Sequence, residues 1–303
     1  MSAVASTLDC RGPFVIGGLG GSATRVYAAL LQHAGLHMGG YLNPARDNLF
    51  VTLLLKRRYE LLEDRRLALR ALGLLEKKLA RGGRMTLAEH AMLWRVARDV
   101  SLRGHSYQGH GRGWWAWQAA LRVARSRPPQ LEGSRGWGFK EPNTHVFLEA
   151  LAERFEGLRF MYVVRHGLDM AFSGNVAQLH AWGGHFGVEL PRDAEELPRA
   201  QLDYWVAATE RAIETGTRLL GERFLVMRYD ELTTDPRPQL DRLGAWLDVD
   251  PACFDDPVAL EWARPSSSQG RYKDRGLEGF TSDQLRRVEA LGFTVEGPGH
   301  GAP

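Results

Sequence analysis

The stretch "FVIGGLGGSATRVYAALL", residues 14–31, constrains the fold more than any other part of the chain. It begins with a short apolar run, passes through a glycine cluster and continues with apolar residues at helical spacing. This order predicts a buried strand that leads through a tight turn into a helix. Such a turn gathers free backbone N–H groups at the positive end of a helix dipole, which is a ready site for an anion. From the glycines alone, a tight turn that binds nothing is an equally good interpretation.

The residues of this turn fit an anion site but match no triphosphate motif. They are small residues, hydroxyl residues and one arginine at the helix start: Gly20, Gly21, Ser22, Ala23, Thr24 and Arg25. A Walker A motif would need a lysine before the Ser or Thr. The dinucleotide fingerprint also fits poorly. It tolerates Ala23 at its third glycine position, but no ribose-binding acid follows about 20 residues later in a strand-end context.

Further strands and helices alternate along the chain. "GWGFKEP", "RFMYVVRHG" and "RFLVMRYDEL" are typical of buried strands, and "AGLHMGG" indicates another. Helical patterns separate them, which predicts an α/β fold with a P-loop-like central parallel sheet flanked by helices. Residues 59–130 instead carry successive amphipathic helices. We therefore expect one domain over residues 1–303, with residues 59–130 as a helical insertion that caps the sheet.

Composition excludes several classes of function. The chain has 39 Lys and Arg against 36 Asp and Glu, so its net charge of +3 does not indicate a general nucleic-acid binder. Its two cysteines, Cys10 and Cys253, form no metal-binding motif. No run of about 18 apolar residues predicts a membrane span, and no signal peptide is evident. These features predict a cytoplasmic protein without a metal, and they leave its oligomeric state open.

A second constellation lies in "VVRHGLDMAFS", residues 163–173. Arg165 closes a predicted strand, and Ser173 follows about two turns into the next predicted helix. A strand-terminal arginine can form a fork on a phosphate, and the serine can donate to the same group. Taken alone, a surface arginine and a helical serine would explain the pattern better. Its combination with the first turn favours a nucleotide site.

With both constellations in place, the sequence resembles the PAPS-dependent sulfotransferases. Their 5′-phosphosulfate loop, of the "RSGTT" or "KGGTR" type, is similar to "GGSATR", and their 3′-phosphate motif matches Arg165, Asp169 and Ser173. "GFKEPNTH", "RYDELTTDP" and "SSSQGRYKDRGLEGF" resemble three further segments of the family, the last being its basic C-terminal lid. The resemblance extends over about residues 14–280.

The resemblance implies an enzyme that moves a sulfuryl group from PAPS to an acceptor hydroxyl, leaves PAP and needs no metal. It assigns residues 21–25 to the 5′-phosphosulfate, and Arg165 and Ser173 to the 3′-phosphate. Arg271 and Lys273 lie where the family's lid closes over the nucleotide. Tyr229 is expected to line the adenosine pocket or to belong to the core. The acceptor would be a small molecule or a glycan.

The sequence departs from the family at Gly21, where a Lys or Arg is usual. Lys140, at the end of a predicted strand, is the first candidate to supply the missing charge, because ligands bind at the carboxyl edge of such sheets. Arg25 is the alternative.

The general base is less defined by the sequence. Asp47 is the first candidate, because it follows the predicted second strand, and His105 in a glycine-rich loop is the next. Glu141, beside Lys140, is expected to pair with that lysine. His145 is either a base or a structural histidine.

Two groups of residues are candidates for the acceptor site. The first either forms an aromatic wall or belongs to the core: Trp114, Trp115 and Trp117. The second follows the 3′-phosphate motif and is expected to face the acceptor: Trp182, His180 and His185. Two other functions stay open at this point. One is a P-loop kinase or NTPase, which the missing lysine and the absent Walker B acid disfavour. The other is a nucleotide-binding relative without catalytic activity.

Overall fold

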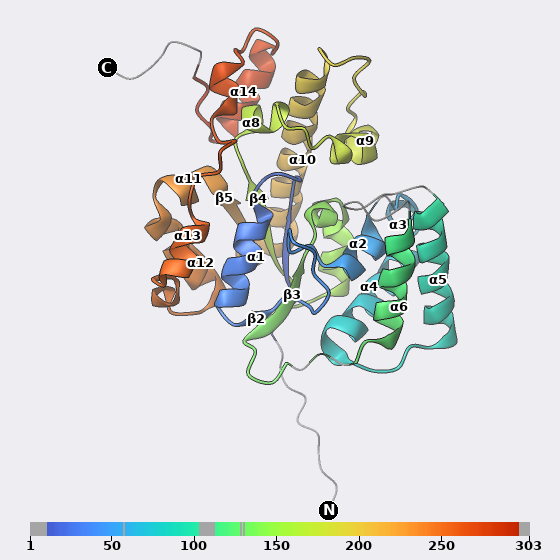
Figure 1. Ribbon diagram of the computed structural model, residues 1–303. Coiled ribbons are helices and arrows are strands. Elements are labelled where there is room, and N and C mark those ends of the chain that lie inside the picture. Colours follow the sequence, from blue (N-terminus) through green and yellow to red (C-terminus); the bar gives the residue numbers. More distant parts are fainter. Residues whose placement is uncertain (1–10, 57, 103–112, 128, 130, 297–303) are drawn as a thin grey trace, which may run out of the picture.

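The computed structural model describes residues 11–56, 58–102, 113–127, 129 and 131–296 (Figure 1). A sheet of five parallel strands forms its centre, in the order β2-β3-β1-β4-β5. The strands are β1 Phe14–Gly18, β2 Leu36–His37, β3 Gly136–Lys140, β4 Arg159–Val164 and β5 Phe224–Arg228. The predicted parallel sheet flanked by helices is confirmed, although the second strand has only two residues.

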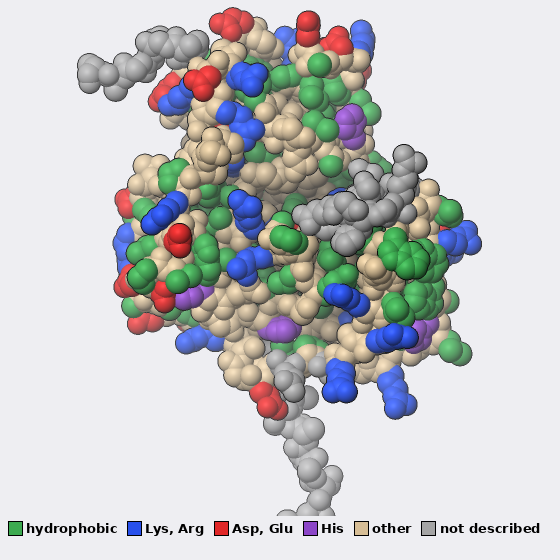
Figure 2. Space-filling model, in the orientation of Figure 1, with side chains coloured by type: hydrophobic (Ala, Val, Ile, Leu, Met, Phe, Trp, Pro, Cys, Tyr) green, Lys and Arg blue, Asp and Glu red, His purple; other side chains and the backbone are tan. Residues whose placement is uncertain are grey.

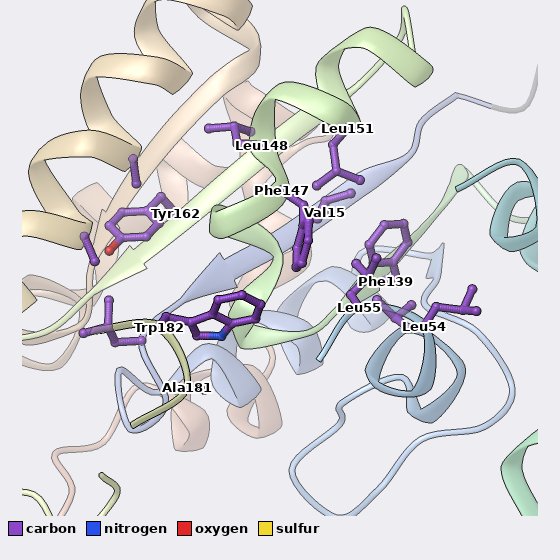
Figure 3. Close-up of a cluster of buried hydrophobic side chains, with 14 of the residues drawn as sticks. Val15, Leu54, Leu55, Phe139, Phe147, Leu148, Leu151, Tyr162, Ala181 and Trp182 are labelled. Carbon is purple, nitrogen blue, oxygen red and sulfur yellow. The ribbon is translucent and has the colours of Figure 1, made fainter. Parts of the chain in front are cut away.

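Both faces of the sheet are buried, which explains why its strands are continuous apolar runs. Side chains of β1 alternate between the faces, because successive residues of a strand point in opposite directions. Ile16 belongs to a core cluster with the helices α1 Thr24–His33, α12 Pro236–Leu247 and α13 Pro257–Trp262. Val15 belongs to the cluster of the other face, with α7 Leu148–Arg154 and α10 Leu197–Leu220 (Figure 3).

A group of helices, called the cap below, lies on the right of the sheet in Figure 1 and begins ten residues before the predicted range of 59–130. They are α2 Leu49–Leu55, α3 Glu60–Glu63, α4 Arg65–Glu76, the π-helix η1 Lys77–Arg81, α5 Leu87–Leu102 and α6 Trp114–Arg125. Asn48 and Asp64 cap the N-termini of α2 and α4 by accepting hydrogen bonds from backbone N–H groups. The amphipathic helices expected over residues 59–130 are therefore present in the described part of that range.

Short elements complete the fold: η2 Pro142–Phe147, α8 Gly167–Ala171, α9 Ala177–Trp182, η3 Gly183–Phe186, η4 Gly221–Arg223, α11 Tyr229–Thr234, η5 Pro251–Phe254, η6 Arg271–Asp274 and α14 Ser282–Ala290. The expectation that Ser173 lies in a helix is wrong, because α8 ends at Ala171. The Ser173 hydroxyl accepts a hydrogen bond from the Asn175 N–H at 3.2 Å, and Gly174 separates the two residues. Such local bonds and glycine both compete with helix formation.

Within the described residues, no helix is both long enough and apolar enough to cross a membrane. The same residues contain no cluster of three or more His, Cys, Asp or Glu side chains able to hold a metal ion.

Candidate active site

The turn after β1 has the geometry of an anion-binding loop. The Ser22 N–H and hydroxyl both donate to the Leu19 carbonyl, at 3.0 and 2.5 Å, and this closes the turn. Ala23 adopts the left-handed conformation at φ 66° and offers no side-chain cap to α1. The first N–H groups of α1 are therefore left without a capping side chain, and this is the state that favours an anion.

The turn lies against the segment that follows β4. Gly21 has a φ of +107°, and a Cβ atom placed there would lie 3.3 Å from the Met170 methyl carbon and 3.7 Å from the Ser173 hydroxyl oxygen. The loop of residues 20–25 and Ser173 are therefore neighbours at one edge of the sheet. The two motifs that the sequence placed about 150 residues apart form one site.

Arg165 adds a charged side chain to this candidate site. It follows β4 directly, and only 4% of the residue is exposed. Its guanidinium donates to Asp169 at 3.1 Å and to the Ser268 hydroxyl at 3.0 Å. Its Nε is buried without a hydrogen-bond partner among the described residues. The side chain is thus fixed in direction and keeps an unused donor, as an anion ligand requires.

Asp169 connects this arginine to the C-terminal segment. Its carboxylate, 1% exposed, also accepts hydrogen bonds from the backbone N–H groups of Gly270 at 2.8 Å and Tyr272 at 3.4 Å. One buried acid therefore pairs with Arg165 and holds the segment that carries the predicted lid. A buried ion pair of this kind needs such additional hydrogen bonds to offset its desolvation.

The structure separates the two predicted basic lid residues. Arg271 donates to the carbonyls of Ser268 at 3.0 Å and Phe172 at 3.2 Å, beside Ser173. Burial, and then the charge of Arg165, lower the pKa of Arg271. Lys273 instead pairs with Glu296 at 2.5 Å, which raises the pKa of the lysine. Arg271 thus belongs to the Arg165 site, whereas the described contact of Lys273 lies elsewhere.

Tyr229 is a buried residue at the start of α11. Its ring centre is 5.9 Å from the Arg165 guanidinium carbon, and its hydroxyl donates to the Arg264 carbonyl at 3.0 Å. It therefore packs in the core and contacts the candidate site at the same time, which agrees with both roles that the sequence allowed.

Lys140 and Asp47, two separate candidates in the sequence, are in contact. Lys140 ends β3, is 3% exposed and forms an ion pair with Asp47; it also donates to the Ala45 carbonyl at 3.1 Å. Asn43 donates to the other Asp47 oxygen at 2.8 Å. Lys140 is the register partner of Ile16 and so shares the sheet face covered by α1. The alternative cation, Arg25, is exposed at the start of α1.

The sequence suggested that Glu141 pairs with Lys140, but the structure gives Glu141 other partners. Its carboxylate is 2% exposed and accepts hydrogen bonds from the N–H and the side-chain amide of Asn143, at 2.7 and 2.8 Å. Burial, followed by the nearby charge of Asp47, raises the pKa of Glu141 to about 7. Lys140 reaches Asp47 instead, so the two adjacent residues belong to different hydrogen-bond groups.

A buried hydrogen-bond chain runs from Glu141 to the loop. The Asn143 side-chain oxygen accepts from Gln178 Nε2 at 3.1 Å, and the Gln178 oxygen accepts from the Gly20 N–H at 2.5 Å. Gln178 therefore holds the backbone of the anion-binding turn. Sequence reasoning missed both Asn143 and Gln178. Asn143 lies within "GFKEPNTH", but no role was assigned to its side chain, and 35 residues separate it from Gln178.

Several other candidates are placed away from these groups. Trp182 is fully buried, packs edge-on against Phe147 (Figure 3) and donates to Asn143 at 2.9 Å, so the expectation that it faces the acceptor is wrong. Trp115 is core, whereas Trp114 is 62% exposed. Trp117 is half-buried and stacks on Trp94.

The remaining candidate bases are histidines. His145 is buried, its Nδ1 lies 2.8 Å from the Pro142 carbonyl oxygen, and burial lowers its pKa to about 4, all of which fit a structural role. His105 lies outside the described residues.

The fold and the site together define an α/β protein with a candidate anion-binding centre at the carboxyl edge of a parallel sheet. The family can be stated more closely. Residues 13–256 match the model of the Sulfotransferase family, and the chain belongs to that family. The predicted transferase class is thereby confirmed, and the kinase or NTPase alternative is not supported.

Solved sulfotransferases are similar to this chain at a distance. Sulfotransferase STF9 from Mycobacterium avium is 18% identical, with a TM-score of 0.44, over 96% of this chain and 79% of that one. The sulfotransferase domain of the Synechococcus PCC 7002 olefin synthase is 17% identical, with a TM-score of 0.45, over 95% and 98%. A sulfotransferase domain from the curacin biosynthetic pathway is 13% identical, with a TM-score of 0.46, over 94% and 99%. No curated protein matches the chain.

Proposed function

We propose that this sulfotransferase takes its sulfuryl group from PAPS and transfers it to a hydroxyl of a small molecule or glycan. The observation that carries the proposal is the meeting of two anion-binding groups at one sheet edge. The loop of residues 20–25 lies against Ser173, and Arg165 and Arg271 lie beside it. PAPS carries two separate anionic groups, and this arrangement offers a place for each.

The loop and the N-terminus of α1 would hold the 5′-phosphosulfate, since their N–H groups are not capped by side chains. Arg165, Ser173 and Arg271 would hold the 3′-phosphate. The unpartnered Nε of Arg165 supports this role, because a buried donor without a partner gains most from an anion. Tyr229, against Arg165, would border the adenosine. Lys273 would have to leave Glu296 to take part.

In the reaction, the bond between sulfur and the 5′-phosphate oxygen breaks, and a bond from sulfur to the acceptor oxygen forms. The acceptor proton passes to a base, and PAP leaves with the electron pair of the broken bond. Negative charge on the leaving oxygen must be stabilised by nearby cations and N–H groups. Lys140 would supply that cation, and Asp47 would take the acceptor proton or hold Lys140 in place. Arg25 and His105 remain the second candidates for these two roles.

The helices of residues 59–130 would shape the acceptor site, since they stand beside the sheet edge at which Asp47 and Lys140 lie. The alternative function is a nucleotide-binding relative without catalytic activity. The Lys140–Asp47 pair distinguishes the two. If the pair is catalytic, its removal abolishes turnover and leaves the nucleotide bound.

A thermal-shift series tests the donor. We expect PAP to raise the melting temperature, and ADP or ATP with Mg²⁺ to raise it little, because neither carries a 3′-phosphate for Arg165. In Arg165→Gln the PAP shift should vanish, whereas Arg286→Gln, an exposed arginine of α14, should keep it. Stabilisation by ATP and not by PAP would overturn the proposal.

A second experiment tests Lys140. Lys140→Met should bind PAP nearly as tightly as the natural protein while losing about 100-fold or more in kcat, which is the cost of removing one stabilising group at an oxyanion. Sulfate transfer is read by the mass gain of the acceptor. Unchanged turnover would rule out Lys140 as the replacement cation and would direct attention to Arg25.

A further inference from the structure

A pocket of about 270 Å³ opens where the cap meets the strand β2. One wall comes from residues 37–50, between β2 and α2, and the opposite wall from η1 and the C-terminal part of α6. Phe50, Leu79 and Val123 give it an apolar interior. Its volume is slightly below the roughly 300 Å³ at which pockets for drug-sized ligands start, so it suits a small ligand with one or two rings.

The charged side chains that line this pocket in the described part of the chain are all cationic. They are Lys78, Arg122 and Arg127, and none of the lining residues described is acidic. Lys and Arg side chains gather over this lower part of the cap in Figure 2. Burial lowers the pKa of His37, which also lines the pocket, so its imidazole is neutral near pH 7. The pocket therefore combines an apolar interior with a positive rim.

Arg122 and Lys78 are held in place without forming an ion pair among the residues that the structure describes. The Arg122 guanidinium lies 4.6 Å from the centre of the Tyr41 ring, so it bridges the two walls. Lys78 donates to the Ser126 carbonyl at 3.1 Å. Two carboxylates lie near Lys78 in sequence, and each pairs with another cation: Glu89 binds Lys77 and Glu76 binds Arg81, although the charge of Glu89 also acts on Lys78. An incoming anion would meet pre-positioned positive charge.

Two observations relate this pocket to the reaction centre. Asn48, one of its lining residues, donates its N–H to the Lys140 carbonyl at 2.8 Å and directly follows Asp47. Lys78 and Leu79 belong to a π-helix, an irregular turn that occurs frequently at functional sites. The pocket thus begins one residue from the pair to which we assigned the chemistry.

We propose that this pocket binds an acceptor that carries an anionic group on an apolar, one- or two-ring body, with Arg122 and Lys78 selecting the anion. The proposal rests on the sulfotransferase function and specifies its acceptor class. The acceptor's hydroxyl lies toward Asp47 and Lys140, and its anionic group lies at the rim between η1 and α6.

Binding is tested first, with probes that cannot be sulfated. By calorimetry in the presence of PAP, 2-naphthoate should bind and the isosteric 2-naphthamide should bind at least fivefold more weakly. Arg122→Gln and Lys78→Gln should each weaken naphthoate at least fivefold, and added salt should do the same. The control Arg125→Gln, on the same helix but outside the pocket lining, should bind like the natural protein. Absent naphthoate binding, equal binding of both probes, or equal losses in Arg122→Gln and Arg125→Gln would overturn the proposal.

Two further experiments follow. The first distinguishes an acceptor from a free inorganic anion, and the second distinguishes failure of the pocket from failure of the proposed donor. Inorganic sulfate should compete with naphthoate only at much higher concentration; competition at equal concentration would make this a site for free anions instead of an acceptor site. With PAPS as donor, 6-hydroxy-2-naphthoate should be sulfated with a kcat/KM at least fivefold above that of its amide, and this ratio should fall toward one in Arg122→Gln. Selective naphthoate binding without PAP binding or transfer would refute the sulfotransferase donor and leave the anion pocket standing.

Discussion

Asp169 offers the sharpest test of how the candidate site is held together. We expect Asp169→Asn to lower the free energy of unfolding by about 3 kcal/mol, because it removes the counter-charge of a buried arginine. The lost oxygen, Oδ2, accepts from Arg165 Nη2 at 3.1 Å and from the Gly270 N–H at 2.8 Å. Each hydrogen bond to a charged group contributes about 1.5–3 kcal/mol, and the smaller values apply where a loop can relax.

The assay is urea-induced unfolding followed by tryptophan fluorescence, with a thermal scan beside it. A loss of about 3 kcal/mol corresponds to a melting temperature about 6 °C lower for a chain of this size. Asp283→Asn is the matched control, because it breaks an exposed pair with Arg286 in which both side chains are about two-thirds exposed. Exposed pairs contribute less than about 1 kcal/mol.

The same substitution should release the segment that Asp169 holds. Trypsin should cleave Asp169→Asn faster around residues 264–275, since Gly270 loses its acceptor and Tyr272 keeps only a neutral amide oxygen in place of a carboxylate oxygen. If the variant loses less than about 1 kcal/mol, like the control, or resists trypsin like the natural protein, then Asp169 does not hold the Arg165 site to the C-terminal segment.

Four other substitutions test separate parts of the site and its surroundings. Gln178→Leu leaves the Gly20 N–H without its acceptor and should weaken PAP binding about 5- to 30-fold, measured by calorimetry, as expected for a lost bond of about 1–2 kcal/mol; unchanged affinity would contradict the role of the buried chain. Gly21→Lys should lower stability by about 1–2 kcal/mol in urea unfolding without raising turnover, because φ +107° is strained for a residue with a Cβ; a more active variant would contradict this. Two buried groups should give opposite pH dependences of stability. The pKa of Glu141 is raised to about 7, so its contribution falls as pH rises from about 4.5 to 7, and Glu141→Gln should remove that fall. The pKa of His145 is lowered to about 4, so stability is lost as pH falls from 6.5 to 4, and His145→Gln should remove that loss. If the unfolding free energies of the two variants depend on pH in the same way, both assignments are refuted.

Much of the fold was predictable because buried parallel strands and amphipathic helices leave strong periodic patterns. In the strand Arg159–Val164, residues 160–164 form an unbroken buried run, and both faces of the strand are covered. The break after Ala171 was not predictable from periodicity, because the apolar spacing continues across it. The helix ends for local reasons: Gly174 follows, and the Ser173 hydroxyl accepts a hydrogen bond from the Asn175 N–H.

The candidate site was also predictable only in part. Residues close in sequence, such as Arg165, Asp169 and Ser173, were found together because their spacing is a property of the chain. The contacts that join segments were not visible in the sequence. Lys140 and Asp47 are 93 residues apart, and Gln178 and Gly20 are 158 apart. Only the strand order β2-β3-β1-β4-β5 brings such segments to one edge.

The glycine at position 21 first suggested a lost cation, and the structure gives it a second meaning. At φ +107°, with Met170 and Ser173 within 4 Å of an added Cβ, this position favours glycine for steric reasons. A lysine there would strain the backbone before it could supply charge. On our proposal, the positive charge for the leaving oxygen therefore comes from a residue other than position 21. Lys140 is fixed and buried but bound to Asp47, whereas Arg25 is exposed at the helix start. If Lys140 is the cation, the acid that holds it is also the acid best placed to take the acceptor's proton, and the two roles become inseparable in Asp47.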